Sequence, residues 1–256
     1  GKQVVDFVNQ DELQRKFYSI AFRVEEDVLD LPDATHQMRY CEATPKTARV
    51  YRDLSEEFYA QVEAGEVTVA NALTKIIRLQ QVTSGYIVTD DGETHEYGNE
   101  KAHLLSDILE DIDVQEPIVV FARFHHDLDV IRAVLEQSGR SCAELSGRVN
   151  QYLSWKGGDA TAIITQMQSG SVGIDFTRAR YCLYYSVDHS LGNFQQSQCR
   201  ILRPGQTRPV TYYYLAMRHT IDTAIYKALR KKESVIDAVL NRASADDDTE
   251  RQLTLL

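Results

Sequence analysis

The residues best suited to chemistry are one amide and two guanidinium side chains in the C-terminal half. Gln196, Arg200 and Arg203 stand at positions i, i+4 and i+7 of NFQQSQCRILRPGQ. If this segment is a helix, the spacing puts all three on one face. Two adjacent guanidiniums repel each other unless they meet an anion, and their planar donors match phosphate oxygens. The pattern therefore predicts a phosphate site, although either arginine alone could be a solvated surface charge.

A second segment has the residue types of a loop that binds ligands through its main chain. The apolar run ATAIITQM is followed by Gln168, Ser169 and Ser171, and the loop closes on Gly173 and Asp175. SGSVG nearly spells the nucleophile elbow G-x-S-x-G, but its first glycine is missing. The elbow also needs a following helix, whereas FTRA and another apolar run come next. A serine hydrolase is therefore disfavoured.

Two residue pairs that resemble metal-binding patterns have simpler explanations. Asp11-Glu12 resembles an acidic pair that holds Mg²⁺, but it begins a helical pattern instead of ending an apolar strand, which indicates a helix cap. His125-His126 would point about 100° apart on a helix, so a polar helix start is favoured over a metal pair.

The four cysteines are scattered, and the sequence shows no signal-peptide pattern and no apolar run of membrane length. A cytoplasmic protein without membrane contact is expected.

The C-terminal half predicts strands that alternate with helices. PIVVFA, ATAIITQM and YCLYYSV are short apolar runs without strict alternation, which is typical of strands buried on both faces of a parallel sheet. The predicted fold class is therefore α/β, with a parallel sheet flanked by helices over residues 116–241.

Residues 35–115 predict one strand followed by a helical insertion. In that insertion Thr44-Pro45 is typical of a helix start, with Thr44 as the N-cap. VANALTKIIRLQQVTSG predicts a helix that ends before Gly85, and TDDGETHEYGNE predicts a turn or hairpin. Four apolar side chains of that helix are spaced for burial, Leu73, Ile76, Ile77 and Leu79.

The net charge of −10 is unevenly distributed. Residues 1–115 hold 11 Lys and Arg against 23 Asp and Glu, whereas residues 116–256 hold 17 against 15. Binding depends on the local field, so the acidic total does not exclude a nucleic-acid partner. The acidic helical region would face away from DNA or meet a protein, or it would simply be solvated. Residues 1–34 predict a helical stub, and residues 242–256 a mobile acidic tail.

Six segments in the same order resemble the Swi/Snf-like ATPases of helicase superfamily two, over about residues 17–240. QSQCRILRPGQ is similar to their motif VI, SGSVGIDF to motif V and PIVVFARF to motif IV. ELSG resembles the L-x-G of the next strand, and IIRLQQVTSGYI the family's L-x-x-L-R-Q helix. FRVEEDVLDLP, at residues 22–32, resembles the connector between the two lobes.

The resemblance implies a RecA-like lobe of the P-loop-NTPase type, the second of two lobes that hold ATP and Mg²⁺ between them. Arg200 and Arg203 would act on the γ-phosphate, with Arg203 as the arginine finger. Three residues would bind the nucleotide, Gln196, Gly173 and Asp175. Four would contact the nucleic-acid backbone, expected to be double-stranded DNA, namely Arg123, Gln168, Ser169 and Ser171.

Some positions depart from the family pattern. Asp175 replaces a frequent asparagine, Ser171 and Cys199 replace glycines, and Val24 replaces a connector arginine. Residues 146–159 are also shorter than in large remodellers. These departures indicate a compact bacterial or phage-type member, in the cytoplasm of a bacterial cell or of a phage-infected host.

A phosphate-binding loop of the form G-x-x-x-x-G-K-[ST] does not occur in the 256 residues. Since the connector resemblance falls at residues 22–32, we expect a C-terminal lobe whose first lobe lies in a longer protein or on a separate chain. The lobe alone would bind ATP poorly and hydrolyse none. A rival hypothesis is a non-catalytic nucleic-acid-binding or protein-interaction module, which would leave the arginines without a purpose.

Overall fold

The computed structural model describes residues 12, 16, 30–63, 69–89, 91–169 and 173–240, and only the backbone of 59–63, 69–72 and 233–240. The chain divides into two compact units, residues 31–226 and residues 1–30 with 227–256. In the smaller unit Lys16 Nζ pairs with Glu12 Oε1 at 2.7 Å. Most of the predicted connector and the whole predicted tail lie outside the described residues. None of the described helices is long and apolar enough to cross a membrane.

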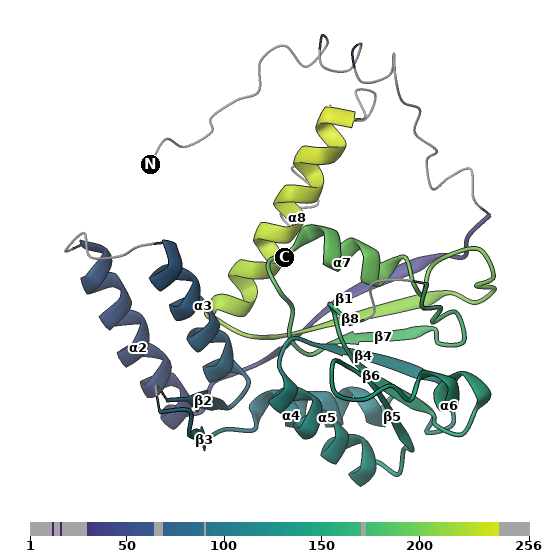
Figure 1. Cartoon of the computed structure of the whole chain (residues 1–256), viewed down its shortest axis with the longest axis horizontal. Helices are drawn as coiled ribbons and strands as arrows, with labels where there is room; N and C mark the ends of the chain where they lie inside the picture. The colour runs from purple at the N-terminus through teal and green to yellow at the C-terminus, as the bar shows by residue number, and fades with distance from the viewer. Residues whose placement is uncertain are drawn as a thin grey trace. The chain divides into compact units, whose positions relative to one another are not determined.

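The larger unit contains a six-stranded sheet in which every neighbouring pair is parallel (Figure 1). The strands are β1 (Ala34–Cys41), β4 (Ile118–Ala122), β5 (Cys142–Leu145), β6 (Ala162–Gln166), β7 (Tyr181–Tyr184) and β8 (Val210–Met217). Their order across the sheet is β1-β8-β7-β4-β6-β5. The predicted α/β class with a parallel sheet is confirmed.

Side chains of β4 enter cores on both faces of the sheet. Ile118, Val120 and Ala122 lie in one apolar cluster with residues of α4 (Glu100–Glu110) and α5 (His125–Gln137). Phe121 alternates with them and therefore points to the other face. There it stacks on Tyr184, with ring centroids 5.2 Å apart, and meets Phe176 edge-on at 6.0 Å. Phe176 follows Asp175 directly, so packing on this face positions the predicted ligand loop.

A helical region separates β1 from β4 along the chain. Its elements are α2 (Pro45–Glu63), α3 (Val69–Thr83) and an antiparallel hairpin of β2 (Tyr86–Val88) and β3 (Thr94–Glu96). Thr47 N donates to Thr44 Oγ1 at 3.3 Å, and the helix begins at Pro45, which confirms the predicted cap. The prediction that Leu73 is buried is wrong, because half of its surface is exposed, whereas Leu79 is buried.

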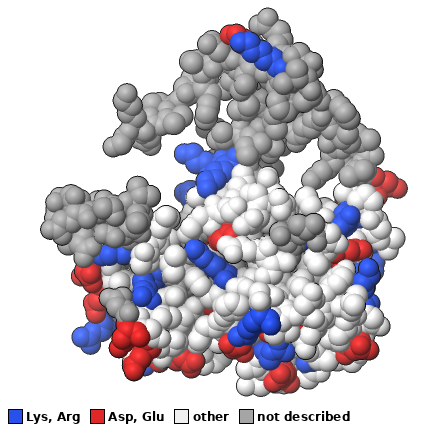
Figure 2. Space-filling view, in the orientation of Figure 1, with Lys and Arg blue, Asp and Glu red and all other residues white. Residues whose placement is uncertain are grey.

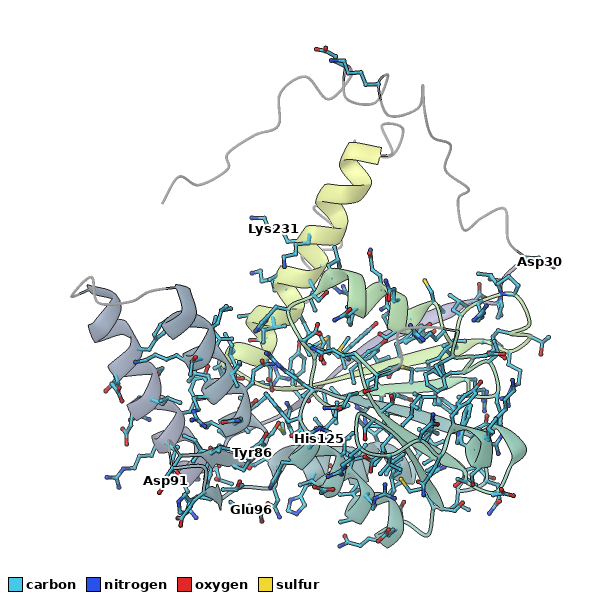
Figure 3. All side chains as sticks on the ribbon, in the orientation of Figure 1. Asp30, Tyr86, Asp91, Glu96, His125 and Lys231 are labelled. Atoms are coloured by element: carbon cyan, nitrogen blue, oxygen red, sulfur yellow. The ribbon has the colours of Figure 1, made fainter. Side chains whose placement is uncertain are left out.

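The hairpin lies beside the start of α5, as the labelled Tyr86, Glu96 and His125 show (Figure 3). The ring of His126 stacks on that of Tyr86 with centroids 3.9 Å apart, and its Nε2 lies 2.9 Å from Glu96 Oε1. The two histidines therefore form the polar helix start that the sequence indicated.

A buried ion pair fastens the helical region to the last strand. Lys101 Nζ of α4 lies 2.9 Å from Asp222 Oδ2, and both side chains are almost fully buried. Asp222, at the start of α8 (Ile221–Leu240), also accepts hydrogen bonds from Thr83 Oγ1 at 2.9 Å and Met217 N at 3.1 Å. Removing one charge of such a pair leaves the other uncompensated, so this contact holds α3, α4 and β8 together.

Candidate nucleotide and nucleic-acid site

The carboxyl ends of four strands form one rim, the edge where open parallel sheets bind ligands. Arg123, after β4, donates its main-chain N–H to Ser186 Oγ beyond β7 at 2.8 Å. The carbonyl of Arg123 accepts from Gln166 Nε2 at the end of β6 at 3.3 Å. Gly147, after β5, donates its N–H to Gln166 Oε1 at 3.5 Å. Gln166 thus joins the ends of three strands, a role that the sequence did not indicate.

The guanidinium of Arg123 has partners within the chain. Its Nη1 donates to Gln80 Oε1 of α3 and lies 3.2 Å from His189 Nε2. Burial lowers the pKa of Arg123, and the nearby carboxylates of Asp188 and Asp127 oppose this effect. Arg123 therefore stands at the rim, with its charge held by a residue of the helical region, and its contact with a nucleic acid stays a prediction.

The loop after β6 begins with a turn in which Ser169 N donates to Gln166 O at 3.1 Å. Gln168 is exposed and Ser169 is half-buried. Ser171 lies outside the described residues. Gly173 is exposed and has φ +72°, a left-handed conformation that favours glycine. This position requires the glycine for its backbone, a reason additional to the close ligand approach that we predicted.

Asp175 is fixed by bonds to its side chain and its main chain. Thr177 N donates to Asp175 Oδ1 at 2.9 Å. The hydroxyl of Tyr152, from α6 (Tyr152–Gly157), bonds to both the N–H and the carbonyl of Asp175. Burial raises the pKa of Asp175, but the bonds from Thr177 and the charges of Arg203 and Lys156 outweigh burial and lower it. The carboxylate is therefore held ionised.

The helix α7 (Leu191–Gln198) carries Gln196 above the aromatic face of the sheet. Ser190 caps the helix by accepting from Asn193 N at 3.3 Å. Phe194 packs on Tyr184 at 5.3 Å between ring centroids, and the Tyr184 hydroxyl lies 2.7 Å from Ser197 Oγ. Gln196 is exposed, as a ligand-facing residue requires.

The prediction that one helix presents Gln196, Arg200 and Arg203 together is wrong. The helix ends at Gln198, and residues from Arg200 onward form turns. A helix that ran on to Arg203 would leave the carbonyl of Arg200 without a partner, because Pro204, four residues later, has no N–H. The freed carbonyl of Arg200 instead accepts from Phe176 N at 2.9 Å. The arginine segment is thereby bonded to the loop that carries Asp175.

The two arginines are close enough to influence each other. Arg200 is buried, with 8% of its surface exposed, whereas Arg203 is exposed. Burial lowers the pKa of Arg200, and the positive charge of Arg203 lowers it further. Neither guanidinium forms a hydrogen bond or an ion pair with another residue in the described part of the chain. Asp175 is the acidic group whose pKa responds to Arg203, so the cluster has an excess of positive charge.

Gln206 braces the site by bonding the arginine segment, at Ile201, to the loop that follows Asp175, at Thr177 and Ala179. It was not recognised as a site residue from the sequence. Its buried amide donates to the carbonyls of Ala179 at 2.8 Å, Thr177 at 3.1 Å and Ile201 at 3.4 Å. The amide oxygen accepts from Thr207 N and Arg208 N, both at 3.1 Å. The signal for this role was its place at the end of the Pro-Gly-Gln sequence, where a tight turn leaves main-chain groups to be satisfied.

The described residues hold no group of three or more His, Cys, Asp or Glu side chains placed to bind a metal ion. On the face drawn in Figure 2, basic and acidic side chains are interspersed among neutral ones.

Comparisons with known proteins show what this chain is similar to. Residues 100–205 match the family described as helicase conserved C-terminal domain. A Caenorhabditis elegans protein named "SWI/SNF-related matrix-associated actin-dependent regulator of chromatin subfamily A containing DEAD/H box 1 homolog" is 26% identical over 176 residues, 60% of this chain and 17% of that protein. "Putative protein p41" of Acyrthosiphon pisum secondary endosymbiont phage 1 is 21% identical over 221 residues, 84% of this chain and 47% of that protein. The chain therefore spans less than half the length of both relatives.

Solved structures show the same fold. The C-terminal part of the Fun30 ATPase domain has a TM-score of 0.64 at 16% identity, covering 78% of this chain and 89% of that one. The Sulfolobus solfataricus SWI2/SNF2 ATPase core in complex with dsDNA has a TM-score of 0.62 at 21% identity, covering 93% of this chain and 53% of that one. The sheet with its flanking helices is thus RecA-like. Residues 100–205 are therefore similar to helicase C-terminal domains, and the similar proteins include SWI/SNF-type proteins, in line with the resemblance of the sequence motifs.

Proposed function

We propose that this chain is the second lobe of an ATP-dependent nucleic-acid translocase, which works with a RecA-like first lobe and moves on double-stranded DNA. The observation that carries the proposal is the pair of guanidiniums at Arg200 and Arg203, which influence each other and have no ion pair with a described residue. A phosphate group bound beside both arginines would offset the repulsion between their like charges, and guanidinium donors match its oxygens.

In this proposal each residue of the nucleotide site has a distinct role. Arg203, which is exposed, acts as the arginine finger, and Arg200 stabilises charge on the same phosphoryl group. Gln196 orients the nucleotide or the attacking water, and Asp175 accepts from a ribose hydroxyl near Gly173. When bound, ATP with Mg²⁺ supplies the transferable γ-phosphoryl group and its charge-neutralising cation. The residues that would hold Mg²⁺ belong to the first lobe.

The nucleic-acid track would follow the carboxyl ends of β4 and β6. Arg123 offers charge there, and Gln168, Ser169 and Ser171 offer main-chain N–H groups and hydroxyls. The family match over residues 100–205 supports a nucleic-acid partner, and the similarity to an ATPase core solved with dsDNA supports a duplex. Contacts of this kind are independent of sequence, as a translocating motor requires.

The proposal is tested by joining the chain to a RecA-like first lobe that carries the phosphate-binding loop. We expect hydrolysis of ATP that is stimulated by duplex DNA in the two-lobe protein and absent from residues 1–256 alone. Turnover by residues 1–256 alone would contradict the proposal. DNA binding without any hydrolysis in the two-lobe protein would instead favour a non-catalytic binding module.

A further inference from the structure

A tyrosine outside the predicted site holds the main chain of Asp175. The Tyr152 hydroxyl donates to the carbonyl of Asp175 at 2.8 Å and accepts from its N–H at 3.2 Å. Residues 173–176 belong to no helix or strand, so these groups have no ladder in which to pair, and buried main-chain groups need partners. One hydroxyl therefore satisfies both main-chain groups of the residue that carries the loop's carboxylate.

The aromatic core fixes the ring that carries this hydroxyl. The Tyr152 ring meets Phe176 edge-on, with centroids 6.2 Å apart, and lies tilted against Trp155 at 6.4 Å. Trp155 has no exposed surface and packs edge-on against Phe176 at 5.6 Å. Because close-packed aromatic rings move little, the hydroxyl has a defined position relative to Asp175.

The short helix α6 also brings a positive charge toward the same loop. Lys156, four residues after Tyr152, has its Nζ 5.8 Å from the centroid of the Tyr152 ring. Lys156 and Arg203 both favour the ionised form of Asp175. The carboxylate is thus influenced by charges from α6 and from the arginine segment, and its position depends on how the main chain of Asp175 is held.

We propose that Tyr152 is a positioning residue of the nucleotide site, whose hydroxyl fixes Asp175 so that its carboxylate meets the bound nucleotide beside Arg203. This inference rests on the proposed function, since Asp175 has a ligand to position only if a nucleotide binds there. Tyr152 itself does not touch the nucleotide and acts through Asp175.

The first test uses the chain itself. Tyr152→Phe keeps the ring and removes the hydroxyl, and Tyr181→Phe is the matched control because the Tyr181 hydroxyl bonds to no described residue. In hydrogen-exchange mass spectrometry of a peptide covering 173–178, Tyr152→Phe should speed exchange about tenfold, the size expected for the loss of one or two hydrogen bonds. The Tyr181→Phe protein should match the wild type. Unchanged exchange in Tyr152→Phe would show that the Tyr152 hydroxyl does not hold the main chain of Asp175, and it would overturn the inference.

The second test is a double-mutant cycle in the two-lobe protein, measured as DNA-stimulated ATP hydrolysis. Tyr152→Phe should raise the KM for ATP about tenfold with kcat changed less than about twofold, and it should have little further effect on an Asp175→Ala background. Equal increases on both backgrounds, or an unchanged KM, would overturn the inference. A merely structural tyrosine would loosen the loop without this dependence on Asp175.

Arg203→Ala, measured in the same series, separates the two claims. If Arg203→Ala abolishes turnover while Tyr152→Phe leaves the KM for ATP unchanged, the positioning role fails and the proposed function stands. If Arg203→Ala turns over like the wild type, the proposed function fails and the role of Tyr152 falls with it.

Discussion

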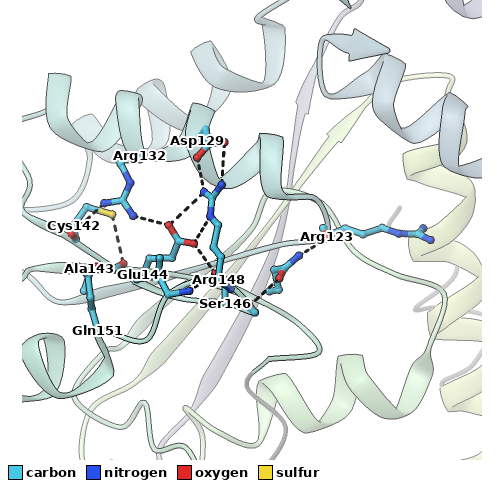
Figure 4. A network of polar contacts seen from close by, with 12 residues as sticks. Arg123, Asp129, Arg132, Cys142, Ala143, Glu144, Ser146, Arg148 and Gln151 are labelled. Carbon is cyan, nitrogen blue, oxygen red and sulfur yellow. Dashed lines mark hydrogen bonds and ion pairs between the residues drawn. The ribbon is translucent and has the colours of Figure 1, made fainter. Parts of the chain in front are cut away.

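Two arginine clusters near the carboxyl edge of the sheet differ in how their charges are balanced. Around Glu144, Arg132 Nη2 lies 2.7 Å from Oε2 and Arg148 Nε lies 2.8 Å from Oε1 (Figure 4). Asp129 adds a second carboxylate to Arg148. Arg200 and Arg203 have no such ion pairs among the described residues.

The pKa values follow this difference. Burial would raise the pKa of Glu144, but the bonds from Arg148, Ser146 and Arg132 outweigh burial and lower it to about 2. Hydrogen bonds to Asp129 and Glu144 raise the pKa of Arg148, whereas burial and a like charge lower that of Arg200. A charge that is balanced within the chain stabilises the fold. A charge that is not balanced there is suited to an external anion.

The largest effect should come from truncating a site arginine. In the two-lobe protein Arg200→Ala should lower the ATPase rate about 10²- to 10³-fold, the loss expected for one donor to a developing negative charge. Arg132→Ala is the control from the balanced cluster, which consists of Glu144, Arg132, Arg148 and Asp129. Its rate should stay within about twofold of the wild type. Steady-state ATPase assays at saturating DNA measure both. Equal losses in the two variants would remove the distinction between the clusters.

Removing the carboxylate of Glu144, which Arg132 and Arg148 share, should have a smaller effect than truncating a site arginine, and that effect should be on stability. Glu144→Gln leaves two guanidiniums short of a partner, so the free energy of unfolding should fall by about 2 kcal/mol at pH 7. Urea unfolding followed by the fluorescence of Trp155, the single tryptophan, measures it. The folded-state pKa of Glu144 lies below its ordinary 4.5. Its contribution is therefore complete above about pH 4.5 and is lost as the pH falls toward 2. A variant whose deficit is the same at pH 7 and pH 3 would contradict this assignment.

The brace at Gln206 should have a somewhat smaller effect on stability. Gln206→Leu removes the donors to three carbonyls while keeping most of the volume, so unfolding should need about 1.5 kcal/mol less free energy. The same urea titration measures the loss. Gln168→Leu is the control, since Gln168 is exposed on the neighbouring loop. A loss as large in Gln168→Leu would show that the effect does not come from the brace.

The smallest effect should come from the outer member of the balanced cluster. Asp129 is 59% exposed, and it pairs with an Arg148 that Glu144 already binds. Asp129→Asn should therefore change the free energy of unfolding by less than about 0.5 kcal/mol. A loss similar to that of Glu144→Gln would mean that the exposed Arg148–Asp129 pair contributes as much to stability as Glu144 does.

The sequence predicted the strands because their signals are local, whereas the roles of the site residues stay predictions. Buried parallel strands appear as short apolar runs, and Thr44-Pro45 fixes a helix start with two residues. The end of α7 was predicted too late, because the competing bond runs from Phe176 to Arg200, which are distant in sequence. The six-residue helix α6 has no periodicity to detect, so the role of Tyr152 was not foreseen. Strand order and the brace at Gln206 also depend on long-range contacts.

The most direct test of the account is the ATPase rate of the two-lobe protein with Arg203→Ala, at saturating ATP and duplex DNA. An arginine finger contributes about 10³- to 10⁵-fold to the rate, so the variant should lose at least about 10³-fold while it still binds DNA. A loss of less than about tenfold would contradict the assignment of Arg203 to the phosphoryl group, and with it the proposal that this lobe supplies the finger of a motor.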